Sequence, residues 1–538
     1  MKLNQNKVLE SKFFLLARNF FFSKKRKKSM KLNICIGGKA GQGINKISAI
    51  LSSILTKYGY YTFNYRDYQS LIRGGHNFNV LSISDEPVNS QDSKINILVC
   101  FDARTLSTHQ KNLTKKSIII NSDDFRYEGK NLNVALAGSL VKILGIPLEC
   151  LLDEIKIEFS ESKKSIASAE KGYNSKKEEF FLRKLNNKIE ICSGNKAIAL
   201  GARKANLDIY IAYPMSPSTN ALHEIAKKQL EENRLVFQAE NEISVISMAL
   251  GASFAGAKTL IGTSGGGFDL MGESLSMQGM SEIPLCIYLA SRQGPSTGVP
   301  TYNSQADLDI ALRSGHGEFP RIVVAPGTPN EIIEKVQECL FLSEKFKSLS
   351  IVLSDKHLAE SEYSSSEKPK DIPQYKIERK IPGSSIIKAS SYEKDEFGNS
   401  TELASLTEKN TDKRFERYEE AKDYILKNCE MIKIHGKKDS KNLIIGWGST
   451  SNAIKDAIKG LDVKFLQVLY MKPMSDEIRK EIQKAKHIIV IECNITGQLG
   501  RLIREKTGIK IDSRILKYDG RPFYTDELKE NIEEWVSK

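Results

Sequence analysis

Short apolar runs bounded by glycine or proline turns recur along the chain, and several are followed by segments with apolar residues at helical spacing. The runs that predict buried strands are Leu32–Ile36, Ile95–Cys100, Ser117–Ile120, Ile209–Ala212, Thr259–Gly262 and Pro284–Ala290. Helical spacing predicts helices over Ile44–Tyr58 and Ile243–Gly256. Strands alternating with helices predict a multi-domain α/β protein that begins with a doubly wound domain.

The length of 538 residues is too great for one core, so several domains are expected. The patterns divide the chain into a doubly wound domain at 30–185, a second α/β domain at 186–360 and a final domain at 436–538. Between the last two, residues 361–435 are charged and serine-rich, which predicts a solvated linker or a partly ordered connector. The run of mixed charge near 160–185 is expected to be another connector.

The N-terminal stretch stands apart in its charge. Residues 1–30 hold nine Lys or Arg and one acid, a charge of +8, so the rest of the chain carries only +6 of the total of +14. That excess is modest, and no nucleic-acid binding is expected. The Phe/Leu cluster precedes the basic run at 24–28, which is the wrong order for a secretory signal. We expect residues 1–29 to be a disordered or non-native extension, with an amphipathic targeting or membrane-surface segment as the alternative.

Composition limits the class of protein further. Hydrophobic residues make up 40% of the chain, without an uninterrupted apolar stretch of membrane-spanning length, so a soluble protein with no membrane span is expected. The eight cysteines lack Cys-x-x-Cys spacing and the seven histidines are dispersed, so no metal site or iron–sulfur cluster is expected within this chain. Isolated thiols indicate a cytoplasmic location.

Four polar loops follow predicted strands in the second domain, at the strand ends where open α/β sheets bind ligands. They are Tyr213–Thr219 with two prolines and several hydroxyls, Phe237–Glu242 with two carboxylates, Thr263–Phe268 with three glycines, and Arg292–Thr301 with one cation. Taken singly, the cation is also explained by a solvated turn, and the carboxylates by their place at a helix N-terminus. The convergence of all four loops favours a shared binding pocket.

A glycine turn in the first domain is a second candidate site. The segment Gly37–Gly43 lies between the first predicted strand and its helix, which is typical of a phosphate cradle with Gly38, Gly41 and Gly43 as contacts. Neither the Walker spacing nor the strict dinucleotide fingerprint is present, so tight backbone packing is an equal explanation. Another flexible polar turn is expected at Arg73–Asn77.

With these motifs in order, residues 186–360 resemble the pyrimidine-binding domain of the 2-oxoacid:ferredoxin oxidoreductase alpha subunit. The motifs are Tyr-Pro-Met-Ser-Pro-Ser at 213–218, Gln-Ala-Glu-Asn-Glu at 238–242, Thr-Ser-Gly-Gly-Gly at 263–267 and Arg-Gln-Gly-Pro-Ser-Thr-Gly-Val-Pro-Thr at 292–301. The turns at 38–43 and 73–76 resemble the family's gamma domain, fused ahead of alpha. A transketolase C-terminal-like domain is indicated by Gly-Trp-Gly-Ser-Thr at 446–450, Glu-Cys-Asn-Ile-Thr-Gly-Gln at 492–498 and Lys-Tyr-Asp-Gly-Arg-Pro-Phe at 517–523.

The resemblance implies a role for each loop. Thiamine diphosphate is the implied cofactor, and Glu242 the catalytic glutamate that hydrogen-bonds its aminopyrimidine ring, with Glu240 as the alternative. Arg292 would pair with the carboxylate of a 2-oxoacid, and Ser216, where the family usually has threonine, would bind the same substrate, as would Thr297. Further cofactor contacts are expected from Thr263, Ser264 and Gly265.

The resemblance also implies a partner. This chain has no Gly-Asp-Gly followed by asparagine for magnesium and the diphosphate, and no cysteine cluster. A beta subunit that carries Mg and a [4Fe-4S] cluster is therefore implied, in a heterodimer or a dimer of heterodimers that reduces ferredoxin. The helix predicted over Ile243–Gly256 is rich in small residues and is expected to contribute to the subunit contact. Coenzyme A would lie partly against the glycine turns of the first domain.

The implied reaction is the oxidative decarboxylation of a 2-oxoacid with coenzyme A to acyl-CoA, carbon dioxide and reduced ferredoxin. The substrate favoured is 2-oxoglutarate, because the fused gamma–alpha layout resembles that group; pyruvate and branched-chain 2-oxoacids are the alternatives. A catalytically degenerate scaffold or nucleotide-binding partner subunit is an alternative of another class. The presence of Glu242 and Arg292 argues against it.

Overall fold

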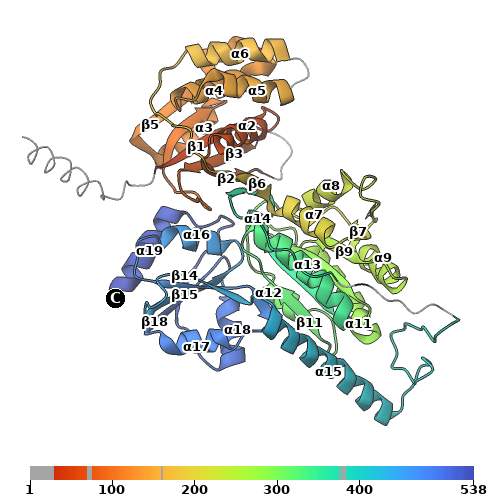
Figure 1. Ribbon diagram of the computed structural model, residues 1–538. Helices are drawn as coiled ribbons and strands as arrows, with labels where there is room; N and C mark the ends of the chain where they lie inside the picture. The colour runs from red at the N-terminus through yellow and green to blue at the C-terminus, as the bar shows by residue number, and fades with distance from the viewer. Residues whose placement is uncertain (1–29, 70–74, 159–161, 375, 377–382) are drawn as a thin grey trace, which may run out of the picture.

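Three α/β units meet at a common junction in the computed structural model (Figure 1). The structure describes residues 30–69, 75–158, 162–374, 376 and 383–538. The extension predicted at 1–29 lies outside the described residues, as do residues 73 and 74 of the predicted Arg73–Asn77 turn. Within the described ranges no helix is long and apolar enough to cross a membrane. The prediction of a multi-domain α/β protein is confirmed.

The first unit contains a seven-stranded sheet in the order β5-β4-β1-β3-β2-β13-β6. Its strands are β1 (Lys31–Lys39), β2 (Tyr61–Asp67), β3 (His76–Ser84), β4 (Ile95–Cys100), β5 (Leu113–Asn121), β6 (Glu190–Ser193) and β13 (Glu362–Ser365). Its helices are α2 (Ile44–Lys57), α3 (Ala103–His109), α4 (Leu132–Ile143), α5 (Leu148–Glu158) and α6 (Ser162–Asn174). The sheet is mixed, because β3 runs antiparallel to both β1 and β2.

Strand pairing in this sheet crosses the predicted domain boundaries. β6 falls within the predicted second domain and β13 within the predicted linker, yet β13 pairs with β2 and with β6. β1 also extends past the predicted strand end to Lys39, so Gly37 and Gly38 lie in the strand and the turn is shorter than predicted. His76 and Asn77, predicted in a flexible turn, begin β3.

The connector predicted near 160–185 was wrong over Ser162–Asn174, which forms α6 and packs closely on α4. A Cβ at Gly172 would lie 1.9 Å from the Ala135 carbonyl oxygen, and one at Gly138 would lie 2.1 Å from the Ala169 carbonyl oxygen. The charged residues that suggested a connector lie on the exposed side of this helix. An amphipathic helix with only one packed face has the average composition of a solvated segment.

Substitution of Gly172 by alanine is expected to lower the free energy of unfolding by about 1–3 kcal/mol, because the new methyl group overlaps the Ala135 carbonyl and α6 must shift. Denaturant unfolding of the purified chain measures the change. The matched control is Gly251→Ala in helix α9 (Glu242–Phe254), where a Cβ meets nothing within 4 Å. Equal destabilisation by both substitutions would contradict the packing argument.

The second unit is a seven-stranded sheet in the order β17-β11-β12-β10-β9-β7-β8, parallel except for β17. Its strands are β7 (Ile209–Ala212), β8 (Leu235–Gln238), β9 (Thr259–Thr263), β10 (Leu285–Ser291), β11 (Arg321–Val324), β12 (Leu349–Asp355) and β17 (Tyr470–Lys472). Its helices are α7 (Gly194–Lys204), α8 (Thr219–Ala226), α9 (Glu242–Phe254), α10 (Gly265–Leu270), α11 (Gly272–Ser281), α12 (Leu308–Arg313), α13 (Pro329–Phe346) and α14 (Lys356–Glu360).

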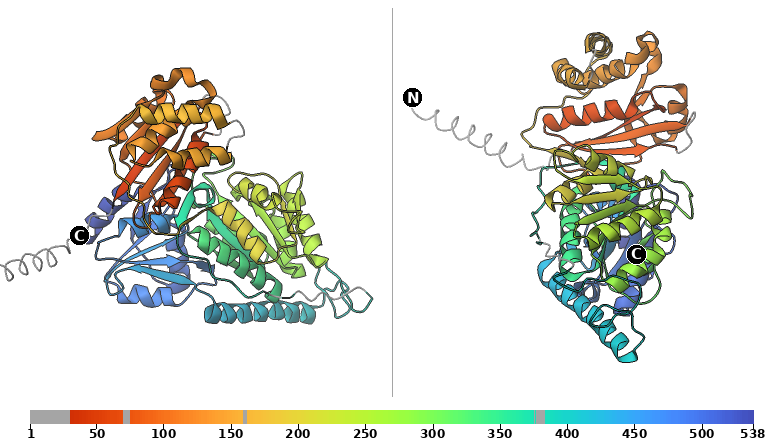
Figure 2. Two further views of the ribbon diagram at one scale, coloured as in Figure 1. Left: turned by 45° about the horizontal axis from the view of Figure 1, so that its top comes forward. Right: turned by 90° about the vertical axis from the view of Figure 1, so that its right-hand side faces the viewer.

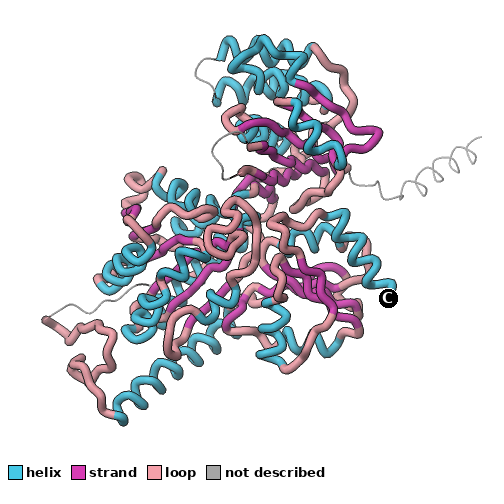
Figure 3. Tube along the Cα trace, turned by 180° about the vertical axis from the view of Figure 1, so that it is seen from behind, coloured by secondary structure: helices cyan, strands magenta, loops and turns pink. Residues whose placement is uncertain are grey.

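The third unit is a five-stranded sheet in the order β14-β16-β15-β18-β19, with β14 as an antiparallel edge. Figure 3 shows the strands of this unit gathered near the C-terminus. It comprises β14 (Ile432–Gly436), β15 (Asn442–Trp447), β16 (Lys464–Val468), β18 (His487–Glu492), β19 (Ser513–Leu516), α16 (Thr450–Ala457), α17 (Glu477–Lys484), α18 (Gln498–Thr507) and α19 (Thr525–Ser537). One apolar core runs from Ile287 and Leu353 of the second sheet to Trp447 and Leu466 of the third. The second and third units are therefore packed as one body.

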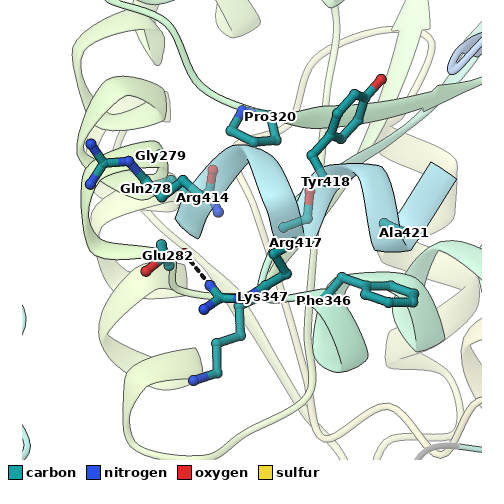
Figure 4. Close-up of a pocket in the computed structure, with 11 residues that line it drawn as sticks. Gln278, Gly279, Glu282, Pro320, Phe346, Lys347, Arg414, Arg417, Tyr418 and Ala421 are labelled. Atoms are coloured by element: carbon teal, nitrogen blue, oxygen red, sulfur yellow. Dashed lines mark hydrogen bonds and ion pairs between the residues drawn. The ribbon is translucent and has the colours of Figure 1, made fainter. Parts of the chain in front are cut away.

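The linker predicted at 361–435 is more ordered than its composition indicated. Besides β13 it contains α15 (Ala404–Asn428), a 25-residue helix that runs along the second unit at the far end from the first unit (Figure 2). Figure 4 shows part of the surface on which α15 packs. Arg417 of α15 forms an ion pair with Glu282 there, and both residues line a cavity of about 20 Å³ together with Phe346. Only Ala421 and Ile425 of α15 are fully buried, so most of the segment carries surface residues.

Candidate functional site

The carboxyl ends of four parallel strands meet at one edge of the second sheet. β7 pairs with β8 and β9, and β9 pairs with β10, all in parallel register. The four polar segments predicted from the sequence therefore share that edge. Counted from the observed strand ends, these segments are residues 213–219, 239–242, 264–267 and 292–301.

Glu242 is the first residue of α9, and its side chain is only 3% exposed. Asn241 caps the helix by accepting a hydrogen bond from the Ser244 backbone N–H at 2.9 Å. The Glu242 carboxyl therefore does not serve as the cap, and it lies beside Gly267 of the three-glycine segment. Its Oε1 atom is buried and has no hydrogen-bond partner among the residues that the structure describes. A buried carboxyl oxygen without a partner is costly, so a ligand that donates a hydrogen bond fits this position.

Glu240, the alternative predicted from the sequence, is placed differently. Its side chain is exposed and accepts a hydrogen bond from the Ser244 hydroxyl at 2.6 Å. That hydrogen bond is the main reason why the pKa of Glu240 is lowered. The fold therefore separates two carboxylates that lie two positions apart in the sequence.

The three-glycine segment begins a helix, which corrects the loop predicted over Thr263–Phe268. Ser264 is the N-cap of α10, and its buried hydroxyl has no partner within the described ranges. A Cβ at Gly265 would lie 2.5 Å from Asp307 Oδ2, and one at Gly267 would lie 2.8 Å from Glu242 Oε1. The glycines are needed because two carboxyl groups approach this turn so closely.

Arg292 follows the end of β10, with its side chain partly buried. Its Nη1 donates a hydrogen bond to the Ser216 carbonyl oxygen at 3.0 Å. Burial lowers the pKa of Arg292, and the nearby Asp307 and Glu242 carboxylates oppose that shift. Arg292 forms no ion pair with any described residue, so its remaining N–H groups can receive a carboxylate.

The loop after Arg292 folds back on itself. Gln293 and Val299 form a bridge, and Gly298 between them has a φ of +50°. A Cβ at Gly298 would lie 2.3 Å from the Gln293 carbonyl oxygen. Thr297, a predicted substrate contact, is exposed in this turn. The structure thus joins Ser216 to Arg292 and leaves Thr297 facing solvent.

Gln305 anchors this loop to the third unit. It is fully buried, its Nε2 donates to the Trp447 carbonyl at 3.0 Å, and its Oε1 accepts from Thr450 Oγ1 at 2.8 Å and from the Cys493 backbone N–H at 3.0 Å. Trp447, Thr450 and Cys493 belong to the C-terminal motifs at 446–450 and 492–498. These motifs of the third unit therefore fix the position of Gln305, which follows the Arg292 loop in the chain.

Asp307 and Ser291 are site residues that the sequence analysis missed. Burial raises the pKa of Asp307 to about 6, and the nearby Ser291 hydroxyl opposes that shift. Both Asp307 Oδ2 and Ser291 Oγ are buried. Asp307 lies beyond the recognisable loop, and Ser291 is the last residue of an apolar strand. No spacing in the sequence marks either residue.

The glycine turn belongs to the first unit, whereas the four segments described above belong to the second. Gly41 and Gly43, with φ values of +88° and +83°, line a cavity of about 290 Å³ together with Lys39, Lys46 and Tyr68. A Cβ at Gly38 would instead lie 2.5 Å from the Phe101 Cβ atom, so this glycine serves packing within β1. Two of the three predicted phosphate contacts therefore face a cavity.

Comparisons with known families agree with this fold and site. Residues 200–427 match the model described as pyruvate flavodoxin/ferredoxin oxidoreductase, thiamine diphosphate-binding, and residues 33–156 match the model described as pyruvate ferredoxin/flavodoxin oxidoreductase. The first match contains all four strand-end segments, and the second contains the glycine turn. The class that fold and site define is an oxidoreductase with a thiamine diphosphate-binding domain.

Individual relatives narrow this class. The chain is 30% identical to a 2-oxoacid:ferredoxin oxidoreductase subunit alpha of a Sulfolobus species, over 94% of this chain and 96% of the relative. The corresponding subunit of Saccharolobus solfataricus is 28% identical over 95% of this chain and 98% of its own length. The structure of the Magnetococcus marinus 2-oxoglutarate:ferredoxin oxidoreductase with 2-oxoglutarate, coenzyme A and succinyl-CoA bound matches with a TM-score of 0.85 at 25% identity, over 95% of this chain and 100% of that chain. The chain belongs to the family of 2-oxoacid:ferredoxin oxidoreductase alpha subunits, which are enzymes.

Proposed function

We propose that this chain is the fused gamma–alpha subunit of an enzyme that oxidatively decarboxylates a 2-oxoacid with coenzyme A, giving acyl-CoA, carbon dioxide and reduced ferredoxin. The observation that carries the proposal is the buried Glu242 Oε1 atom, which has no hydrogen-bond partner among the described residues and lies at the same sheet edge as Arg292. One group offers a proton acceptor to a cofactor, and the other offers a cation to a substrate carboxylate. A scaffold subunit has no need for a buried carboxyl oxygen without a hydrogen-bond partner, or for a partly buried cation without an ion pair, among the described residues.

The residues at this edge fit thiamine diphosphate. Glu242 Oε1 and Ser264 Oγ are buried polar atoms without partners among the described residues, and they can bind the polar edge of an aminopyrimidine ring. Gly265 and Thr263 would contact the same ring. The cofactor, when bound, supplies the carbon nucleophile and the electron sink that decarboxylation of a 2-oxoacid needs. Glu242 would hold and transfer a proton at a nitrogen of that ring, shielded from water by its burial.

Arg292 and Ser216 would orient the substrate. A planar guanidinium can bind both oxygens of a carboxylate, and the hydrogen bond to the Ser216 carbonyl fixes one of its nitrogens. The Ser216 hydroxyl would bind the same substrate. We propose 2-oxoglutarate as that substrate, supported by the M. marinus structure and by 29% identity to the 2-oxoglutarate synthase subunit KorA of Methanocaldococcus jannaschii over 58% of this chain.

A beta subunit would complete the site with Mg, the diphosphate site and a [4Fe-4S] cluster, and ferredoxin would accept the electrons. Relatives of nearly the same length are themselves named as alpha subunits. The exposed face of α9 supports such a partner, since Ile243, Met248 and Phe254 are 39–52% exposed there around the open position of Gly251. A heterodimer or a dimer of heterodimers is the assembly that we propose.

Coenzyme A would reach the site from the first unit. The cavity beside Gly41 and Gly43 is lined by Lys39 and Lys46, and backbone N–H groups of a glycine turn together with lysines suit phosphate groups.

The test is to co-express this chain with the beta-type subunit expected in the adjacent reading frame and to assay the purified complex. Ferredoxin reduction dependent on coenzyme A should be fastest, as kcat/KM, with 2-oxoglutarate. Faster turnover of pyruvate or of a branched-chain 2-oxoacid would change the proposed substrate and leave the proposed type of reaction intact. An assembled complex that turns over none of these acids would favour the scaffold alternative.

A further inference from the structure

Arg521 lies in the C-terminal motif at 517–523, which has no role in the reaction proposed above. Its guanidinium lies over the ring of Tyr302, with the Cζ atom 3.6 Å from the ring centroid. Tyr302 is buried and directly follows the Arg292–Thr301 loop in the chain. This motif of the third unit is therefore packed against the end of the loop that carries the proposed substrate cation.

The turn before Arg521 approaches the same residues closely. The Gly520 carbonyl oxygen accepts a hydrogen bond from the Asn303 backbone N–H at 2.9 Å. Gly520 has a φ of +78°, and a Cβ at this position would lie 3.2 Å from the Tyr302 Cβ atom. Glycine suits both the positive φ and the short distance. The Arg521 backbone N–H donates a hydrogen bond to Asp519 Oδ1 at 2.9 Å, which fixes the end of the turn.

Asp67, the last residue of β2 in the first unit, forms an ion pair with Arg521. The distance between Asp67 Oδ2 and Arg521 Nε is 3.1 Å, and the same oxygen accepts a hydrogen bond from the Tyr65 hydroxyl at 2.9 Å. The Asp67 side chain is only 3% exposed, so this pair is screened by solvent and salt much less than a surface pair. Asp67, Tyr302 and Arg521 thus join one residue from each of the three units.

Tyr302 in turn closes the base of the Arg292 loop. Its carbonyl oxygen accepts a hydrogen bond from the Gln293 N–H at 3.1 Å, and its own N–H donates to the Val299 carbonyl oxygen at 3.0 Å. Residues 295–299 of the loop are exposed, so they have little packing of their own to hold them. Since Gln293 directly follows Arg292, a shift of Tyr302 would displace the neighbour of the guanidinium-bearing residue.

We infer that Arg521 is a positioning residue for the substrate. Held by Asp67, it fixes the ring of Tyr302 and so keeps the base of the Arg292 loop where the Arg292 guanidinium can bind the carboxylate of the 2-oxoacid. A guanidinium suits this place because its flat face stacks on a ring while its edge pairs with a carboxylate, whereas an ammonium has no flat face. The inference rests on the proposed role of Arg292, and it assigns to Arg521 no contact with substrate or cofactor.

The same contacts connect the two ligand sites proposed above. Asp67 lines the first-unit cavity together with Gly41 and Gly43, the cavity proposed for coenzyme A. Through Arg521 this wall is joined to Tyr302 at the end of the substrate loop. Loss of the Asp67 charge should therefore disturb the binding of the 2-oxoacid even when coenzyme A is saturating.

The first experiment is hydrogen–deuterium exchange of the purified full chain, which needs no turnover. In Arg521→Ala, a peptide that contains Gln293 to Tyr302 should exchange about tenfold faster than in the wild type, because the hydrogen bonds at the base of the loop open more often. Equal protection of this peptide in the variant and the wild type overturns the inference.

The matched control is Arg501→Ala. Arg501 also joins the third unit to the second, through an ion pair with Asp309, but its side chain is 50% exposed and the pair lies at the surface. Its removal should leave the exchange of the loop unchanged. Equally fast exchange in both variants would show that the loss of any ion pair between these units loosens the loop, and that result also overturns the role of Arg521.

The second experiment is steady-state kinetics of the assembled enzyme at saturating coenzyme A, with the 2-oxoacid that the wild type prefers. Arg521→Ala should raise the KM for the acid about tenfold and leave kcat within about threefold of wild type. Arg521→Lys keeps the charge beside Asp67 and loses the flat stack, so its KM should lie between, and it can be measured even if the alanine variant fails to fold. Asp67→Asn should raise KM similarly and add little to Arg521→Ala, because both act through one contact.

The outcomes separate this inference from the proposed function. An unchanged KM in both Arg521 variants overturns the inference, and so does a fall in kcat alone, which a purely structural role predicts. Wild-type turnover tests the proposed function by itself. The exchange experiment tests the contact between Arg521 and the loop even if the enzyme turns over another acid or none.

Discussion

Replacing Glu242 with glutamine is expected to reduce 2-oxoacid-dependent ferredoxin reduction by about 10²- to 10⁴-fold while the subunits still assemble. Glutamine has nearly the same shape, so the buried start of α9 should be preserved. It cannot accept a proton at the position of Oε1, which is the atom left without a partner in the described chain. The measurement is the single-turnover rate of the purified complex, with assembly checked by gel filtration.

The matched comparison is Glu240→Gln. This carboxylate is exposed and bonded to Ser244, so its loss should change the rate by less than about twofold. Full activity of Glu242→Gln together with an inactive Glu240→Gln would reverse the assignment of the two glutamates. Full activity of both variants would remove the catalytic proposal for this segment.

Replacing Arg292 with alanine is expected to lower kcat/KM for the 2-oxoacid by about 100-fold, through a higher KM. Two charge-assisted hydrogen bonds to a carboxylate in a partly buried place contribute about 3 kcal/mol. Arg292→Lys keeps the charge and loses the planar fork, so it should lie between alanine and wild type. The measurement is the KM of the assembled enzyme for the acid at saturating coenzyme A.

The control for Arg292 is Arg313→Ala. Arg313 is an exposed cation in the same unit, paired with Asp309 and Glu505, and surface pairs of this kind contribute about 0–1 kcal/mol. Its removal should leave KM unchanged. If Arg292→Ala also leaves KM unchanged, the substrate carboxylate binds elsewhere.

The two glutamates show what the sequence could and could not decide about the site. The order of a strand, two carboxylates and a helix could be predicted, because the spacing of apolar and small residues determines these elements locally. Which carboxylate points inward depends on the hydrogen bonds of Asn241 and Ser244 at the helix start. Local pattern places both acids at the sheet edge, and only the cap geometry orients them.

The charged segments show the same limit for the fold. Residues in α6 and α15 carry enough charge to resemble connectors, yet each helix packs one narrow face on the body of the protein. In α6 that face is made possible by Gly172 against Ala135, and in α15 it reaches Ala421 and Ile425. Average composition cannot reveal a packed stripe when the partner surface comes from distant residues.

The sequence by itself determined the α/β class and the strands that carry the four polar segments, because apolar periodicity and glycine or proline turns act over a few residues. The roles expected for Glu242 and Arg292 came from the family resemblance of those segments. Tertiary structure decided which groups meet. It brought β6 and β13 into the first sheet, tied the substrate loop through Gln305 to the third unit, and buried Asp307 beside the turn at Gly265. These contacts join residues far apart in the chain, and they depend on packing that no local pattern encodes.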